Sequence, residues 1–352
     1  MEAERVPADR AEAISVLARW LSLLAKMPVG LPTPPAPLAV NALKALRALC
    51  EQGDAVLLDS LSIADNARTL YGVVALASAN IDAIDADVNA DTASAGLLLW
   101  GHARKNALAC LVCIASNEAR CKRLVLCNTD TVEGPGVGSS PGPSVCGCCV
   151  DILHSRASRA DMEGLRLSTN LLRNVSMPAA NRAAVGAVGG AITGLLEQVS
   201  HKEPNVAALV AATLRLLVQG CDLNATRAAS VPSVFGRILD LDMTRLHPHA
   251  RAELARFICL TIAHADASSL NESVLDMRAL RFGAFLLGSK YPELHREAVS
   301  ALRVARNRMD CGWIGDGITV PVAGSETLLP QVLRALVDAG SLSAAECEGL
   351  LA

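Results

Sequence analysis

The sequence predicts an all-α protein assembled from repeated helical units, and three observations support this. First, Ala and Leu supply 59 and 52 of the 352 residues, whereas aromatic residues make up only 3%. Ala and Leu are strong helix formers, while β-branched and aromatic residues favour strands. Second, similar helix-ending segments recur at intervals of 42–44 residues. Third, Gly and Pro stand between the expected helices, where their backbone geometry ends or begins a helix.

The clearest unit covers residues 161–199. Its sequence predicts a helix that ends near Val175, followed by a short helix over Asn181–Val188. A break at Gly189–Gly190 comes next, and another helix begins at Ala191. Glycine adopts backbone conformations that other residues avoid, so the Gly-Gly pair separates two helices.

The same helix ending recurs along the chain. The segments LLRNVS, LRLLVQ, CLTIAH and ALRVAR align on Val175, Val218, Ile262 and Val304, at intervals of 43, 44 and 42 residues. Upstream, LVCIAS places Ile114 in the same role, 61 residues before Val175. A Gly-, Pro- and Ser-rich stretch at 128–144 accounts for the excess, and we interpret it as an inserted loop.

A period in the low forties is typical of armadillo or HEAT arrays, whose units bury their apolar faces against one another. Residues 1–98 are expected to form irregular helical repeats, 99–310 regular repeats, and 311–352 a loop with capping helices. Outside the regular part, helices are expected at 17–26, 40–49, 69–78, 328–340 and 343–352, and breaks at 31–38 and 311–324.

Residues 161–199 resemble the armadillo repeat in particular. Leu172, Asn174 and Val175 match its third-helix ending, and Asn181–Arg182 match its linker. The start of the next unit is matched by Gly189, Gly190 and Ile192. The resemblance implies a right-handed superhelical solenoid of armadillo-type repeats, in which the third helices line a concave groove.

Within armadillo proteins, residues 161–305 are similar to the SmgGDS group of GDP dissociation stimulators. The matching phrases are LLRNVSMPAANR, HARAELARFICLTIAHAD and LLGSKYPELHREAVSAL, the last with Ser289, Pro292, Leu294, Glu297 and Ala298 at the group's positions. The resemblance implies binding of a Rho- or Ras-type small GTPase, including prenylated forms. It also implies faster GDP dissociation by differential binding, without covalent chemistry.

The resemblance also indicates which residues face a partner. We expect a partner-binding groove made of Asn170, Asn174, Phe257, Thr261 and Arg303. Asn170 and Asn174 stand one helical turn apart, and an amide offers both a donor and an acceptor to a bound chain. The aligned positions in other repeats do not form an Asn ladder, which favours a folded partner over a long extended peptide. The alternative is that Asn174 makes a helix-end hydrogen bond inside the solenoid.

Charge is unevenly placed beneath a net charge of −3. Residues 51–98 contain eight acidic residues and one basic residue. We expect an acidic patch at Asp82, Asp85, Asp87 and Asp91, which would attract a basic tail of a partner. The alternative is a solvated acidic face. The net charge also argues against nucleic-acid binding through a broad basic surface.

Seven cysteines lie within forty residues, namely Cys110, Cys113, Cys121, Cys127, Cys146, Cys148 and Cys149. Cys110 and Cys113 have zinc-ligand spacing, but they lie in a helical pattern. We favour buried structural thiols over zinc or redox chemistry, with Cys146–Cys149 the better candidates for oxidation if exposed. His247-Pro-His249 favours a turn that starts a helix. The Asp85–Asp91 stretch lacks the Gly and Glu of a calcium loop.

No phosphate-binding loop and no nucleophile elbow is present, so the sequence predicts neither an enzyme nor a cofactor. No apolar run approaches the ~18–20 residues of a membrane span. The N-terminus lacks the features of a secretory signal, and we expect a cytoplasmic protein with access to the nucleus. Two alternatives stay open: an armadillo scaffold or adaptor with other protein partners, and a metal- or redox-dependent protein.

Overall fold

The computed structural model describes residues 36–63, 67, 70, 72–79, 81, 90–126, 144–155, 161–242, 245–270, 277–308, 318–322, 325–347 and 350. This part of the chain is almost entirely helical, as the composition predicts. The helices gather into two compact units, residues 1–191 and 192–352. None of the helices in the described ranges combines the length and the apolar character needed to cross a bilayer.

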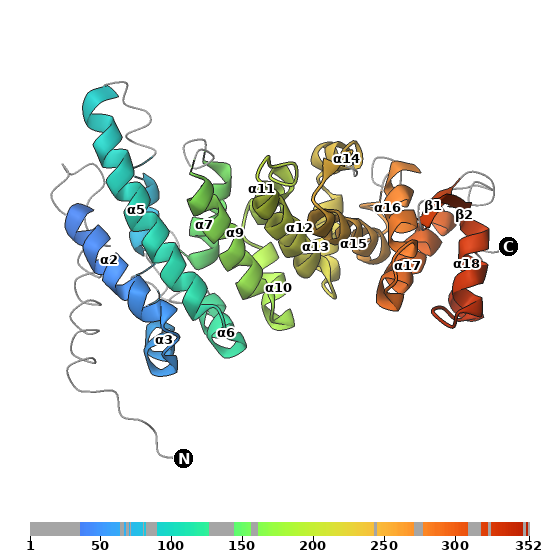
Figure 1. The fold of residues 1–352 in the computed structure, drawn as a ribbon, viewed down its shortest axis with the longest axis horizontal. Coiled ribbons are helices and arrows are strands. Elements are labelled where there is room, and N and C mark those ends of the chain that lie inside the picture. Colours follow the sequence, from blue (N-terminus) through green and yellow to red (C-terminus); the bar gives the residue numbers. More distant parts are fainter. Residues whose placement is uncertain are drawn as a thin grey trace, which may run out of the picture. The chain divides into compact units, whose positions relative to one another are not determined.

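The first unit contains α2 (Ala36–Glu51), α3 (Ala55–Leu61), α5 (Ala90–Ile114), α6 (Glu118–Leu126), α7 (Val145–His154), α9 (Met162–Ser176) and α10 (Ala179–Gly186). Residues 72–79 are helical as well. The long helix α5 packs against both α2 and α9, and Figure 1 shows α2 and α5 side by side. The long helices α2, α5 and α9 are therefore equivalent elements of successive repeats, each packed against the next.

The second unit contains α11 (Ala191–Glu197), α12 (Pro204–Val218), α13 (Asp222–Ala229), α14 (Pro232–Leu239), α15 (Pro248–His264), α16 (Met277–Leu287), α17 (Pro292–Arg308), β1 (Thr319–Val322), β2 (Ser325–Leu328), α18 (Leu329–Asp338) and α19 (Ala344–Cys347). Here α15 packs against α12 and α17 (Figure 1). Two shorter helices, α13 and α14, connect α12 to α15. This order of two short helices and one long helix is the repeating unit.

The expected helix ends agree closely with the structure. Helix α5 ends at Ile114, α9 one residue after Val175, and α12 at Val218. Ile262 lies in the last turn of α15, and Val304 lies in the penultimate turn of α17. All of these side chains are buried except that of Val304, which is partly exposed. Apolar residues thus recur where each long helix joins the core.

The helix starts have local causes. The Asp161 carboxylate accepts a hydrogen bond from the Gly164 N–H and caps α9. Proline begins α12, α15 and α17, and it suits the first turn because no backbone N–H is needed there. Gly190 has φ +81°, a left-handed conformation that places the expected break directly before α11. The predicted helix 181–188 is α10, shifted two residues toward the N-terminus.

Some boundaries differ from the expectation. Helix α2 covers the predicted helix 40–49 but begins at Ala36, inside the expected break at 31–38, because proline is tolerated in a first turn. Helix α5 runs across the boundary expected after residue 98. The stretch 311–324, expected to be a loop, contains β1, which pairs with β2 in an antiparallel hairpin that sets Thr319 opposite Leu328. The predicted helix 17–26 and residues 128–143 lie outside the described residues.

Candidate partner-binding faces of the long helices

Each long helix turns one side toward its unit and leaves the other side partly exposed. In α9 the partly exposed positions include Glu163, Arg166, Asn170, Arg173 and Asn174. Their spacing of three to four residues follows the helical repeat, so they form one continuous stripe. We call the exposed sides of α2, α5 and α9 the first long-helix face, and those of α12, α15 and α17 the second long-helix face.

Asn170 and Asn174 are partly exposed on the first long-helix face, and their role in a partner-binding groove stays a prediction. The Asn170 amide makes no hydrogen bond to any described residue. The Asn174 Oδ1 has a long contact of 3.4 Å to the Arg173 Nη1. The helix-end hydrogen bond is made by the backbone instead, because the Asn174 carbonyl accepts from the Cys121 thiol at 3.3 Å and from the Met177 N–H at 3.1 Å. Both side chains therefore retain hydrogen-bonding capacity for a partner.

Charged groups continue this face onto the neighbouring helices. Arg166 and Glu163 form an ion pair within α9, with 2.8 Å between Nη2 and Oε1. The hydrogen bond from Arg166 is the main cause that lowers the pKa of Glu163, and the charges of Arg47 on α2 and Lys105 on α5 lower it further. Since Arg47 and Lys105 influence the same carboxylate, the exposed sides of α2, α5 and α9 are electrostatically continuous.

The second long-helix face carries ion pairs that cross from one repeat to the next. The Arg215 Nε on α12 lies 2.6 Å from the Glu253 Oε2 on α15. Arg256 on α15 binds Glu297 on α17 through two bonds of 2.8 and 2.7 Å. All of these side chains are between 15% and 21% exposed. The face therefore presents paired charges of both signs at the surface.

Sequence reasoning missed these pairs. Their members are 38 and 41 residues apart, close to the repeat period. Charged residues that recur at nearly the repeat interval are a signal that could have found them, since equivalent positions of adjacent repeats lie side by side.

Two residues of the expected groove are not on its surface. Phe257 and Thr261 on α15 are both 0% exposed, and the Thr261 hydroxyl donates to the Phe257 carbonyl at 2.8 Å. Their assignment to the groove is corrected, because they are buried in the core and their neighbours Glu253 and Arg256 are the partly exposed residues. Arg303 is partly exposed on α17, but it donates to the Ala345 carbonyl of α19 and so binds the C-terminal cap.

The acidic patch is only partly within the described chain. Asp82, Asp85 and Asp87 lie outside the described residues, as does most of the Asp85–Asp91 stretch. Asp91 belongs to the first turn of α5, but its side chain is outside the described part. The patch stays a prediction.

The Asn-Arg linker of the sequence analysis acts as a helix cap. The Asn181 amide donates to the Val175 carbonyl at 2.8 Å and to the Cys121 carbonyl at 3.2 Å. Asn224 does the same one repeat later, donating to the Leu217 carbonyl at 2.9 Å. The Val175 and Leu217 carbonyls lie in the last turns of α9 and α12, where a helix leaves carbonyl groups without intrahelical partners. These asparagines hold the repeats together and are not available to a partner.

The cysteines of α7 do not form an exposed reactive site. Cys146, Cys148 and Cys149 are at most 3% exposed in α7. Burial raises the pKa of Cys146 and of Cys148 to about 12, and it raises that of Cys149 as well. Cys146–Cys149 are therefore not the exposed oxidation candidates considered above. Among the described residues, no three His, Cys, Asp or Glu side chains come together as a metal site.

His247-Pro-His249 starts a helix, as predicted. The His247 imidazole accepts from the His249 N–H at 3.3 Å and caps α15, with Pro248 as its first residue.

The fold is similar to solved structures of designed repeat proteins. A designed armadillo repeat protein named YIII(Dq)4CqI is 14% identical with a TM-score of 0.54, covering 83% of this chain and 100% of that one. Another, YIII(Dq.V1)4CPAF in complex with the peptide (KR)4, is 15% identical with a TM-score of 0.51, covering 83% and 99%. An engineered protein of the Northeast Structural Genomics Consortium is 18% identical with a TM-score of 0.55, covering 83% and 97%.

These likenesses show an armadillo-type repeat fold, which confirms the fold class predicted from the sequence. No family model matches the chain, and no curated protein matches it.

Proposed function

We propose that this armadillo-type protein is a non-catalytic scaffold that binds a protein partner along its long-helix faces. The observation that supports this most directly is the pair Asn170 and Asn174, one turn apart on α9, partly exposed and with amide groups that the fold uses little. An amide pair at this spacing suits the alternating donors and acceptors of a polypeptide backbone. The scaffold acts in the cytoplasm with access to the nucleus.

The charges of the second long-helix face favour a particular kind of partner. One of the similar designed proteins was solved with the strongly basic peptide (KR)4. In this chain, however, Glu253 and Glu297 are already paired with Arg215 and Arg256. A uniformly basic peptide would have to displace these arginines, so the face suits a folded partner that carries charges of both signs.

The partner class that we propose is a small GTPase. The support is the similarity of residues 161–305 to the SmgGDS group, whose matching phrases fall on α9, α10, α15, α16 and α17. A scaffold that binds the nucleotide-poor form more tightly than the GDP-bound form accelerates GDP release without a catalytic group.

The test is a panel of Rho- and Ras-type GTPases, prenylated and unprenylated, each loaded with labelled GDP. We expect the full chain to accelerate release from at least one of them. Asn170→Ala with Asn174→Ala should weaken that effect by about tenfold or more, the usual scale for two central polar contacts. Lys122→Ala, a change of an exposed residue on α6, should leave it unchanged.

The possible results separate the two levels of the proposal. If no GTPase of the panel binds and none releases GDP faster, the proposal that the partner is a small GTPase is wrong. The scaffold proposal then requires that proteins captured from lysate bind the parent chain and are lost with Asn170→Ala and Asn174→Ala. Capture that does not depend on these two residues would contradict it.

A further inference from the structure

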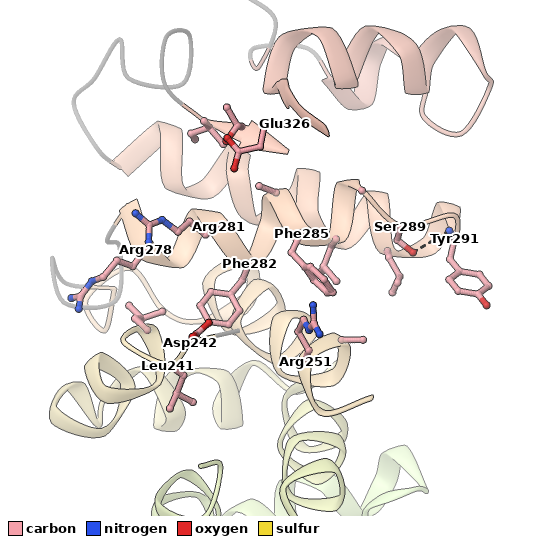
Figure 2. A pocket seen from close by; sticks show the side chains of 18 residues that line it. Leu241, Asp242, Arg251, Arg278, Arg281, Phe282, Phe285, Ser289, Tyr291 and Glu326 are labelled. Carbon is pink, nitrogen blue, oxygen red and sulfur yellow. Dashed lines mark hydrogen bonds between the residues drawn. The ribbon is translucent and has the colours of Figure 1, made fainter. Parts of the chain in front are cut away.

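The second unit contains a large cavity, whereas the proposed amide site on α9 belongs to the first unit. The volume of the cavity is about 920 Å³, within the range of ligand sites. The walls come from the end of α14, the first turns of α15 and α17, the whole of α16, and the hairpin β1–β2. Figure 2 shows Phe282 and Phe285 projecting from α16 toward Leu241 and Arg251.

The cavity contains arginines that lack carboxylate partners. Arg251 lies over the Phe285 ring at 5.6 Å, and its buried Nε makes no hydrogen bond. Its Nη2 has a long contact of 3.5 Å to the Leu246 carbonyl. Arg281 is exposed and forms no ion pair with any described residue. A third arginine in the wall, Arg278, is paired with Asp240.

Two carboxylates also face the cavity, but both have partners. Asp242 is paired with Arg245 at 3.1 Å. The Glu326 carboxylate accepts from the Thr319 hydroxyl at 3.1 Å. Among the described residues that line the cavity, three arginines, Arg251, Arg278 and Arg281, stand against two carboxylates, those of Asp242 and Glu326. The cavity therefore has an excess of positive charge that attracts an anion.

The rest of the lining is apolar and aromatic. Phe282, Leu286, Leu294 and Ile318 form buried parts of the wall. Tyr291 stands at one end with 49% of its surface exposed, at the end of α16 opposite Arg278 and Arg281 (Figure 2). Exposed tyrosine and arginine beside a desolvated apolar pocket are the residue types that dominate protein interfaces.

From this charge and lining we propose that the cavity binds an acidic segment of a partner protein. One carboxylate of the segment pairs with Arg281 and another with the Arg251 guanidinium, and a bulky apolar side chain occupies the space between Phe282 and Leu294. Arginine matches a carboxylate through two parallel hydrogen bonds, which would give the buried Arg251 Nε the acceptor that it lacks. The apolar wall distinguishes such a segment from a simple anion.

The test uses an array of labelled hexapeptides in which Glu and Asp surround one Phe, Leu or Tyr. A matched array carries Lys in place of every acid, and a third carries Ser in place of the apolar residue. We expect members of the first array to bind the full chain saturably, with affinity that falls as salt is added. The other two arrays, and free glutamate or phosphate as competitors, should bind at least about tenfold more weakly.

Matched variants locate the binding. Arg281→Glu should weaken the acidic peptides by about tenfold or more, because it replaces attraction with repulsion at an exposed site. Tyr291→Ala should weaken them as well. Arg334→Glu, the same charge change at an exposed position of α18 outside the cavity wall, should not.

Three results would overturn the proposal: no binding by the acidic array, equal binding by the Lys array, or equal loss in Arg281→Glu and Arg334→Glu. Free phosphate or glutamate competing as well as the peptides would reduce the site to an anion site. The proposal is independent of the amide site, because Asn170→Ala with Asn174→Ala is expected to leave acidic-peptide binding intact.

Discussion

Arg256 and Glu297 face each other across two adjacent repeats and form a two-bond ion pair, with Nε–Oε2 at 2.8 Å and Nη2–Oε1 at 2.7 Å. The pair joins α15 to α17, and both side chains are largely shielded from water, at 20% and 16% exposure. The hydrogen bond to Glu297 is the main cause that raises the pKa of Arg256. The pair is thus part of the contact between two repeats and part of the exposed face.

We expect Arg256→Ala to lower the free energy of unfolding by about 1–3 kcal/mol, because the change leaves the Glu297 carboxylate half-buried without its donor. The double variant Arg256→Ala with Glu297→Ala should lose less unfolding free energy than the sum of the losses in the two single variants. Thermal or urea unfolding measures this. Arg245→Ala serves as the control, since its side chain is 87% exposed and its pair with Asp242 should contribute little. Equal losses of unfolding free energy in Arg256→Ala and Arg245→Ala would contradict the conclusion that the Arg256–Glu297 pair stabilises the contact between repeats.

The linker asparagine gives a second prediction. The amide of Asn181 is buried and donates to carbonyls of α6 and α9, so Asn181→Ala removes both hydrogen bonds and leaves the Val175 carbonyl at the end of α9 without its donor. The expected loss is about 1–3 kcal/mol of unfolding free energy. Hydrogen exchange should accelerate at the end of α9. Asn205→Ala, which removes an exposed amide, is the matched control. An unchanged melting temperature for Asn181→Ala would show that water replaces the amide.

These two sites also show what the sequence could and could not supply. The repeat was predictable because its signals are local: Gly190, the prolines at helix starts, and apolar residues such as Val175 mark the ends of helices. Each of these acts through backbone geometry or through burial of one side chain, which neighbouring residues decide.

The rotation of each long helix was not predictable. Aligning helix ends placed Thr261 in the role of Asn174, although Thr261 is 0% exposed. A shift of one residue turns a side chain by about 100° around the helix, enough to move it from the surface into the core. The same limit hid Arg256 and Glu297, whose contact depends on how two repeats pack. The hairpin β1–β2 was not predicted for another reason. Its strands have only four residues each, too few to show the alternation of apolar and polar residues that identifies a strand.

Stability should fall in acid through Asp161, which caps α9. Burial raises the pKa of this carboxyl, but hydrogen bonds from Arg104, Lys105 and the Gly164 N–H outweigh burial and lower the pKa below its ordinary value of 3.8. A carboxyl with a lowered pKa in the folded state adds stability above pH 3.8, and that stability is lost as the pH falls further through the folded value.

Asp161→Asn isolates this contribution. Asparagine is still a good helix cap, so the change removes the charge while keeping the cap, and it leaves the buried Arg104 without its carboxylate. We expect a loss of about 1–3 kcal/mol at pH 7 and a shallower decline of the melting temperature between pH 5 and 3. Parallel pH profiles for the two proteins would show that Asp161 does not control the acid response.

Gly190 provides the sharpest test of the repeat geometry, because its neighbour is a built-in control. Gly190 has φ +81°, and a Cβ added there would lie 2.7 Å from the Nε2 of His154, which also bonds the Gly190 carbonyl at 3.0 Å. Gly190→Ala should therefore cost about 1–3 kcal/mol through the left-handed backbone and the displaced imidazole. At Gly189 an added Cβ meets nothing within 4 Å, and its φ is not in the left-handed region. Gly189→Ala should be neutral or slightly stabilising.

The two causes at Gly190 can be separated. In a His154→Ala background the clash is gone and only the backbone cost remains, so Gly190→Ala should cost less there than in the parent. An equal cost in both backgrounds would assign the whole effect to φ. If Gly189→Ala and Gly190→Ala are equally mild, the turn before α11 rearranges freely, and Gly190 does not fix where the next repeat begins.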